Sequence, residues 1–162
     1  MKIDIGNALA SVADPGIGEA ALDALDDRVA TAHDRIERGM TDGDFGYAAL
    51  NLPDRTDPAA IEAAVEPLAD SDAVLTVGIG GSALGATTIS TALGPSDTTH
   101  HVLDNVDPEA VTETLDALPL GSTAVNVVSK SGPTAETLSN FLVVRDAMEG
   151  AGVDWADRTV VT

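Results

Sequence analysis

The second half of the chain alternates short apolar runs with helical segments, and this alternation constrains the fold more than any other feature. The runs have the length of strands, and the segments between them have helical spacing or a helix start signal such as Asp-Pro. Strands are predicted at residues 73–77, 101–103, 123–128 and 158–161, and helices at 82–93, 108–118 and 134–148. Because continuous apolar strands alternate with helices, we predict an α/β fold with a doubly wound parallel sheet covered by helices on both faces.

A helical segment is predicted before this pattern. Residues 17–38 carry apolar side chains at alternating spacings of three and four, which is typical of an amphipathic helix. These apolar positions are Leu22, Leu25, Val29, Ala32 and Ile36. Residues 41–57 are rich in Gly, Asp and Pro and are predicted to be a connector. A further helix is expected to begin at Pro58, capped by Asp57, and to end near Pro67.

These patterns divide the chain into two parts. Residues 1–70 form the helical segment and its connector, and residues 71–162 form the α/β domain. The sequence stops at Thr162, inside the fourth predicted strand. We therefore expect the domain to be incomplete at its C-terminal end and the chain to be the first part of a longer protein.

The charge of the chain restricts its partners. Its 27 acidic and 8 basic side chains give a net charge of −19. Such a surface repels nucleic acid and anionic membranes, because binding to phosphate backbones depends on Lys and Arg. We interpret the excess of acidic residues as adaptation to a cytoplasm rich in salt, with an ordinary acidic protein as the alternative. The absence of cysteine excludes disulfides, and no apolar stretch is long enough to span a membrane, so a cytoplasmic location is predicted.

A glycine-rich loop, GIGGSALG, follows the first predicted strand at residues 78–85. Glycines allow close approach of a ligand to the backbone, and the helix that follows offers unpaired N–H groups and the positive end of its dipole. The loop is therefore a suitable anion site. However, Gly78, Gly80 and Ala83 also match the dinucleotide fingerprint G-x-G-x-x-A, with Asp104 placed to bind a ribose. Nucleotide binding therefore remains an alternative interpretation of this loop.

A second loop, SKSGPT at residues 129–134, follows the third predicted strand. Its hydroxyl and N–H groups can donate to phosphate oxygens, and Lys130 adds a positive charge in a chain that has only one other lysine. Pro133, just before the predicted helix at 134–148, has the fixed φ expected of a first helical residue. The alternative is that Ser131 and Thr134 only cap the helix and that Lys130 is a solvated surface charge.

The two loops are expected to lie together. In a sheet of flavodoxin-like strand order, the first and third strands are neighbours, and ligands bind at their carboxyl ends. Both loops would then line one crevice. A doubly charged anion could bind there despite the acidic surface, because two helix N-termini and Lys130 attract it while salt screens the distant carboxylates.

Together, GIGGSALG and SKSGPTAETLSNF resemble the two motifs of the phosphoglucose isomerase family, whose sugar isomerase (SIS) domains carry GIGGS-x-LG and SK-[ST]-x-T-T-x-E-T loops. The resemblance covers residues 73–141 and, with the acidic composition, indicates a member from a halophilic archaeon. It implies that residues 71–162 are a first SIS domain. It implies that Gly81 and Ser82 contact the sugar and that the following residues hold its phosphate: Ser129, Lys130, Ser131, Thr134 and Thr137. Pro133 departs from the family pattern, which usually has threonine there, and removes one hydroxyl and one N–H.

The resemblance also implies a reaction. Family members interconvert glucose 6-phosphate and fructose 6-phosphate by ring opening and proton transfer through a cis-enediol, without metal or cofactor, and are usually homodimers. The catalytic Glu, His, Arg and Lys of the family lie downstream of these loops, so no catalytic residue is assigned in this chain and the chain alone is expected to be inactive. Glu136 is predicted to support the loop, because a carboxylate in the first turn of a helix is favoured by the helix dipole.

Two other functions are kept as alternatives. A regulatory SIS module that senses sugar phosphates would use the same loops without catalytic residues. A Rossmann-type nucleotide-binding domain would use Asp104 and leave residues 129–137 without a role. The histidines His33, His100 and His101 have no acidic or cysteine partners at ligand spacing, so we predict that they are surface residues rather than bases or metal ligands.

Overall fold

The computed structural model describes residues 4–44 and 46–162. Contacts along the chain separate a first unit that ends at Asp57 from a second unit, Pro58–Thr162. The third helix therefore belongs to the unit that contains the sheet. The division into domains at residues 70 and 71 stays a prediction.

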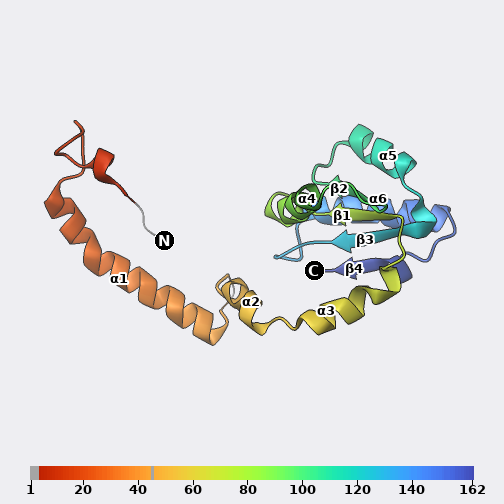
Figure 1. Ribbon diagram of the computed structural model, residues 1–162, viewed down its shortest axis with the longest axis horizontal. Helices are drawn as coiled ribbons and strands as arrows, with labels where there is room; N and C mark the ends of the chain where they lie inside the picture. The colour runs from red at the N-terminus through yellow and green to blue at the C-terminus, as the bar shows by residue number, and fades with distance from the viewer. Residues whose placement is uncertain (1–3, 45) are drawn as a thin grey trace. The chain divides into compact units, whose positions relative to one another are not determined.

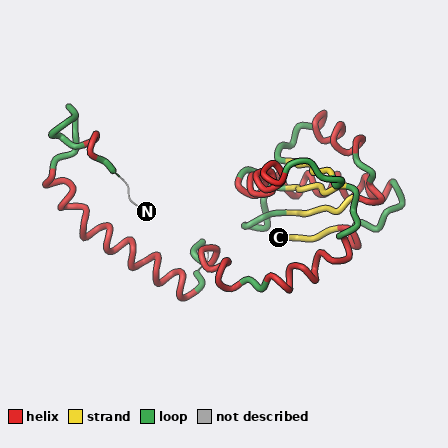
Figure 2. Tube along the Cα trace, in the orientation of Figure 1, coloured by secondary structure: helices red, strands yellow, loops and turns green. Residues whose placement is uncertain are grey.

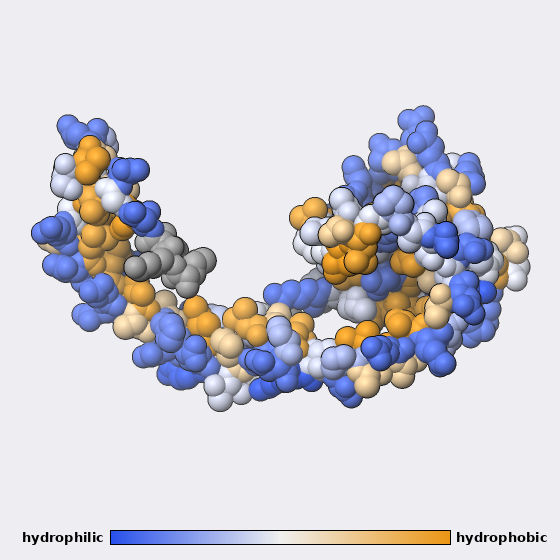
Figure 3. Space-filling view, viewed as in Figure 1, coloured by the Kyte–Doolittle hydropathy of each residue, from blue (hydrophilic) through white to orange (hydrophobic). Residues whose placement is uncertain are grey.

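The first unit contains one long helix, α1 (Glu19–Asp42), preceded by the 3-10 turn η1 (Gly6–Ala8). The predicted amphipathic helix is confirmed, and it continues four residues beyond residue 38 to a left-handed cap at Gly43 (φ 71°). Its apolar stripe leaves Leu25, Val29 and Ile36 exposed. In Figure 3 this stripe is the orange band along α1.

The prediction of a connector at residues 41–57 is wrong in part. This stretch contains the 3-10 turn η2 (Ala48–Asn51) and the short helix α2 (Leu52–Arg55). Pro53 does not prevent the helix, because proline in the first turn lacks only an N–H that has no intrahelical partner. The Asn51 side-chain amide also donates to the Met40 carbonyl, which links this stretch to α1.

The second unit is built on a four-stranded parallel sheet (Figures 1 and 2). The strands are β1 (Ala73–Val77), β2 (Thr99–Leu103), β3 (Thr123–Val127) and β4 (Thr159–Val161), in the order β2-β1-β3-β4. This order confirms the flavodoxin-like arrangement with the first and third strands as neighbours. The second strand begins two residues earlier than predicted, because Thr99 pairs with Ala73.

The helices of this unit are α3 (Pro58–Val65), α4 (Gly81–Leu93), α5 (Pro108–Ala117) and α6 (Ala135–Gly150), with 3-10 turns η3 (Glu66–Leu68), η4 (Leu120–Ser122) and η5 (Ala156–Arg158). Asp107 caps α5 as predicted, accepting from the N–H groups of Glu109 and Ala110 at 2.9 and 3.0 Å. The helix predicted at 134–148 is confirmed, but it begins one residue later and does not include Pro133. Thr134 is the N-cap, in an extended conformation, and the helix begins at Ala135.

The core lies on one face of the sheet. Because side chains alternate along a strand, Leu75 and Val77 of β1 share a face with Val125 of β3. They pack with Val111 of α5, with Leu118 directly after this helix, and with Val144 and Met148 of α6. The helix α4 lies on the opposite face, where Thr76 of β1 is buried. Helices therefore flank both faces, as predicted.

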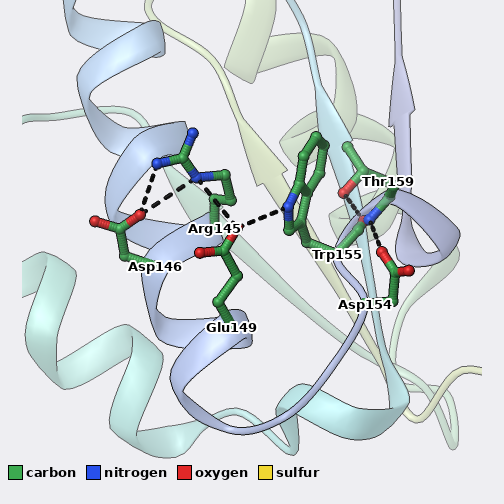
Figure 4. A network of polar contacts seen from close by, with 7 residues as sticks. Arg145, Asp146, Glu149, Asp154, Trp155 and Thr159 are labelled. Atoms are coloured by element: carbon green, nitrogen blue, oxygen red, sulfur yellow. Dashed lines mark hydrogen bonds and ion pairs between the residues drawn. The ribbon is translucent and has the colours of Figure 1, made fainter.

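A polar network fixes the connection from α6 to β4 (Figure 4). The indole N–H of Trp155 donates to Glu149 at 3.0 Å, and Arg145 pairs with the same carboxylate at 3.6 Å. The Trp155 ring also meets Phe141 edge-on, with 5.6 Å between ring centroids. These contacts place Trp155 against the core, where its fluorescence reports on folding of the sheet.

Within the described residues, no helix combines the length and the apolar character needed to cross a membrane.

Candidate functional site

Two loops lie side by side at the carboxyl edge of the sheet. They follow β1 and β3, whose last residues, Val77 and Val127, are partners in the parallel register. The Val128 amide donates to the Val77 carbonyl at 2.9 Å. The strand order therefore confirms that the loops are neighbours, while their binding of one ligand stays a prediction.

The glycine-rich loop makes its closest approach at Gly78. A Cβ atom on this residue would lie 3.0 Å from Ser82 Cβ and 3.2 Å from the Val128 carbonyl oxygen. Gly80 then adopts φ 57° and ψ −120°, a conformation that favours glycine, and α4 begins at Gly81. The first glycine thus allows β1, α4 and the second loop to pack closely, and Gly80 turns the chain into the helix.

Gly78→Ala is expected to lower the free energy of unfolding by about 1–2 kcal/mol, because the added methyl group crowds Ser82 and the Val128 carbonyl. Gly85→Ala is the matched control, since its methyl group would enter open space on the following helix, α4. It is expected to stabilise the protein by up to about 1 kcal/mol through helix propensity. Urea unfolding, monitored by the fluorescence of Trp155, measures the free energy of unfolding of both variants. If Gly78→Ala and Gly85→Ala lower it equally, the close approach at Gly78 is contradicted.

Three hydroxyl groups gather where the second loop enters α6. Thr134 Oγ1 lies 3.0 Å from Ser131 Oγ and 3.5 Å from Ser129 Oγ. Ser129 Oγ also accepts from the N–H of Gly132 at 3.1 Å, and Gly132 has φ 79°. Thr134 makes no side-chain hydrogen bond to the helix backbone, so the capping alternative is wrong for this residue. Its hydroxyl lies in the loop cluster, and the first-turn amides of α6 have no intrahelical acceptors.

Lys130 lies at the exposed tip of this loop. The ion pairs recorded among the described residues involve His33 and Arg145, and none involves Lys130. Its ammonium group is therefore not neutralised by a carboxylate of the described chain. Together with the hydroxyl groups and the helix N-terminus, it forms a set of donors suited to an oxyanion.

The other predicted site residues occupy different environments. Gly81 and Ser82 form the first turn of α4, next to the second loop. Thr137 is 2% exposed in the first turn of α6, whereas its neighbour Glu136 is exposed. Asp104, the ribose ligand of the nucleotide alternative, is exposed directly after β2.

A second polar cluster, which the sequence analysis missed, lies on the α4 face of the sheet. His100 was predicted to be a surface residue, and this is wrong, because its ring is half-buried and both ring nitrogens are bonded. Nε2 lies 3.0 Å from Thr76 Oγ1, and Nδ1 lies 2.9 Å from Ser90 Oγ. These residues line a cavity of about 790 Å³ beside α4. The register of β1 and β2 places His100 and Thr76 on the same face, and no signal in the sequence indicated this because the predicted strand began only at residue 101.

No metal site is formed within residues 4–44 and 46–162: no group of three or more His, Cys, Asp or Glu side chains is arranged to hold an ion.

Comparison with known proteins agrees with this fold. The family model for phosphoglucose isomerase matches residues 68–161. The whole chain is 62% identical to a probable glucose-6-phosphate isomerase of Haloarcula marismortui and 64% identical to one of Natronomonas pharaonis. The chain spans 37% of the length of each of these relatives.

Solved structures agree as well. A hypothetical protein of Thermus thermophilus superposes with a TM-score of 0.70 and 31% identity, over 88% of this chain and 35% of that one. A glucose-6-phosphate isomerase of Chlamydia trachomatis gives a TM-score of 0.63 and 31% identity, over 72% of this chain and 23% of that one. The family model covers more than half of the chain, and these likenesses extend over most of it. The chain therefore belongs to the phosphoglucose isomerase family.

Proposed function

We propose that this chain supplies the sugar-phosphate-binding loops of a glucose-6-phosphate isomerase from a halophilic archaeon. The observation that carries the proposal is the meeting of two family motifs, GIGGSALG and SKSGPTAETLSNF, at one edge of a parallel sheet. In this proposal Gly81 and Ser82 contact the sugar. The phosphate is held by Ser129, Lys130, Ser131, Thr134 and Thr137.

The loop chemistry suits a sugar phosphate better than a neutral sugar. A phosphate monoester carries nearly two negative charges at neutral pH and offers three strong acceptor oxygens. The hydroxyl cluster around Thr134 offers donors, the N-terminus of α6 offers free amides, and Lys130 offers a positive charge. In molar salt the Debye length is about 3 Å, so the many surface carboxylates do not repel the ligand over a long range.

The reaction itself needs groups beyond these loops. Transfer of a proton between C1 and C2 of the open sugar requires a base close to both carbons and stabilisation of the enediolate. Glu136 is exposed in the first turn of α6, where a carboxylate is favoured by the helix dipole, and we assign it a supporting role. The chain alone is therefore expected to bind the substrate without converting it.

Further proposals concern the whole protein. It would interconvert glucose 6-phosphate and fructose 6-phosphate, a step of glycolysis and gluconeogenesis, without metal or organic cofactor. We propose a cytoplasmic homodimer that binds neither nucleic acid nor membranes. Residues 71–162 would be its first SIS domain.

Titration of the purified chain with glucose 6-phosphate by calorimetry, in molar KCl, tests the proposal. We expect binding of glucose 6-phosphate, much weaker binding of free glucose, and no response to NAD. A coupled assay for fructose 6-phosphate should show no turnover by the chain. Binding of NAD alone would favour the Rossmann alternative, which finds no support in the relatives. The lack of any glucose 6-phosphate binding by a folded chain would contradict the proposed site.

A further inference from the structure

We propose that His100 is a positioning residue for the glycine-rich loop, because its ring joins β1 and β2 to α4, the helix that begins in that loop. The inference rests on the proposed sugar-phosphate site. It concerns the orientation of α4 and not contact with the ligand. The residues Thr76, Ser90 and His100 are called the histidine clamp below.

The clamp connects three elements. Thr76 lies on β1, His100 on β2 and Ser90 near the end of α4. The imidazole stands between the two hydroxyls, at 3.0 Å from Thr76 and 2.9 Å from Ser90. The strand partners that share this face are Val74 and His100, while His101 pairs with Leu75 and points to the opposite face.

The hydrogen bonds assign the tautomer of His100. The Ser90 hydroxyl donates to the Thr87 carbonyl at 3.1 Å, so it accepts from the ring at Nδ1. Nε2 is then unprotonated and accepts from the Thr76 hydroxyl. Thr76 is 1% exposed, and no other acceptor for its hydroxyl is recorded in the part of the chain that the structure describes. A neutral ring with the proton on Nδ1 therefore satisfies every group of the clamp.

Few other contacts hold α4 on the sheet. Ala83 is the one residue of this helix that is fully buried. Leu84, Ile89 and Leu93 are exposed, and Figure 3 shows apolar surface, drawn orange, around α4. When apolar packing is sparse, polar contacts decide how precisely a helix is oriented. The orientation of α4 sets the positions of Gly81 and Ser82, because these residues form its first turn.

The environment of His100 favours the neutral ring. Burial lowers the pKa of His100, and the neighbouring His101 lowers it further. No Asp, Glu, Lys or Arg side chain is among the residues that line the cavity around it on β1, β2, β3 and α4. A lowered pKa means that the unfolded chain binds the proton more readily. The clamp thus contributes stability that is fully present above about pH 6.5, the ordinary value for histidine, and is lost as the pH falls through the lowered pKa.

The test compares four variants of the chain in molar KCl. Thr76→Val and Ser90→Ala each remove one link of the clamp. His100→Asn keeps a neutral donor near Ser90 and cannot titrate. His101→Asn is the matched control, because it removes a histidine from the same strand on the opposite face.

Hydrogen exchange of the α4 amides, measured first, needs no ligand. Thr76→Val and Ser90→Ala are expected to speed exchange over Gly81–Leu93 by about fivefold, which corresponds to the loss of one hydrogen bond, and to leave α6 unchanged. His101→Asn should leave the exchange of α4 as in the wild type. Wild-type exchange over α4 in both clamp variants would overturn the inference, whatever the ligand does.

Calorimetry with glucose 6-phosphate is the second measurement, at pH 7.5 and at a series of lower pH values at which the chain stays folded. At pH 7.5 we expect Thr76→Val, Ser90→Ala and His100→Asn each to weaken binding about fivefold, because each removes at least one link of the clamp. The phosphate of the ligand also titrates in this range, with a pKa of about 6, so the affinity of each variant is divided by that of the wild type at the same pH. As the pH falls through the lowered pKa of His100, the wild type should lose affinity relative to His100→Asn, and a merely structural histidine would not produce this difference.

The two measurements separate the two hypotheses. Faster exchange in α4 with unchanged affinity would overturn the positioning role and leave the proposed function intact. If the wild type does not bind glucose 6-phosphate, the proposed function fails and the positioning role fails with it. Faster exchange together with weaker binding, in both clamp variants and not in His101→Asn, supports the inference.

Discussion

Leu75→Ala is expected to lower the free energy of unfolding of the sheet-containing unit by about 3 kcal/mol. Leu75 is 0% exposed, in the middle of β1, and packs in the cluster that includes Val125, Val144 and Met148. Truncation removes three buried carbon atoms and leaves a cavity that a rigid sheet cannot close, so both terms destabilise the fold. Urea unfolding in molar KCl, followed by the fluorescence of Trp155, measures the change.

Leu84→Ala is the matched control for this substitution. Leu84 is 63% exposed on α4, and its loss is expected to change the stability by less than about 0.5 kcal/mol. Both variants remove the same atoms, so the difference between them isolates burial on the core face. A loss of less than about 1 kcal/mol in Leu75→Ala would mean that the core does not lie between β1 and the helices α5 and α6.

The strands of the sheet were largely predictable from the sequence. β1 has the bounds that its apolar run predicts, Ala73–Val77, because a buried parallel strand is apolar on both faces and is delimited by polar or glycine residues. The beginning of β2 was missed. Thr99 and His100 are polar, and their strand conformation depends on pairing with β1, which local pattern does not reveal.

Helix boundaries were less predictable where turn chemistry competes with propensity. Pro133 has the fixed φ of a first helical residue, but the left-handed Gly132 and the hydroxyl cluster on Thr134 hold the chain in a loop until Ala135. In residues 41–57 the density of Gly, Asp and Pro predicted a connector. The helical turns found there are stabilised by contacts such as the one between Asn51 and Met40. Such contacts join residues that are distant in sequence, so composition cannot indicate them.

In the candidate site, too, features within one segment of the sequence were predictable, and contacts between separate elements were not. The loops after β1 and β3 were predicted from their residues, and they come together because the sheet has the flavodoxin-like strand order that was expected for it. The histidine clamp was missed because its members lie on three elements, with Ser90 on a helix and Thr76 on another strand. Whether a polar residue finds partners in the folded protein depends on packing, which the sequence pattern leaves open.

Lys130→Ala is expected to weaken the binding of glucose 6-phosphate by at least about tenfold. A hydrogen bond to a charged group contributes about 1.5–3 kcal/mol, and the Lys130 ammonium group has no ion-pair partner among the described residues that would compete with the phosphate. Lys130→Arg, which keeps the charge and changes the shape of the donor, should retain more of the affinity. Calorimetry in molar KCl measures the dissociation constants of all three proteins.

Lys2→Ala separates a local contact from an effect of net charge. The chain has only these two lysines, and either substitution shifts the net charge of −19 by the same single unit. At molar salt a charge acts over about 3 Å, so the loss of one unit of net charge should by itself change the affinity by less than about twofold. If both substitutions weaken binding equally, the contribution of Lys130 is a long-range one and the phosphate lies elsewhere. If only Lys130→Ala weakens binding, Lys130 contacts the phosphate directly, and this contact explains why so acidic a chain has a lysine at this position.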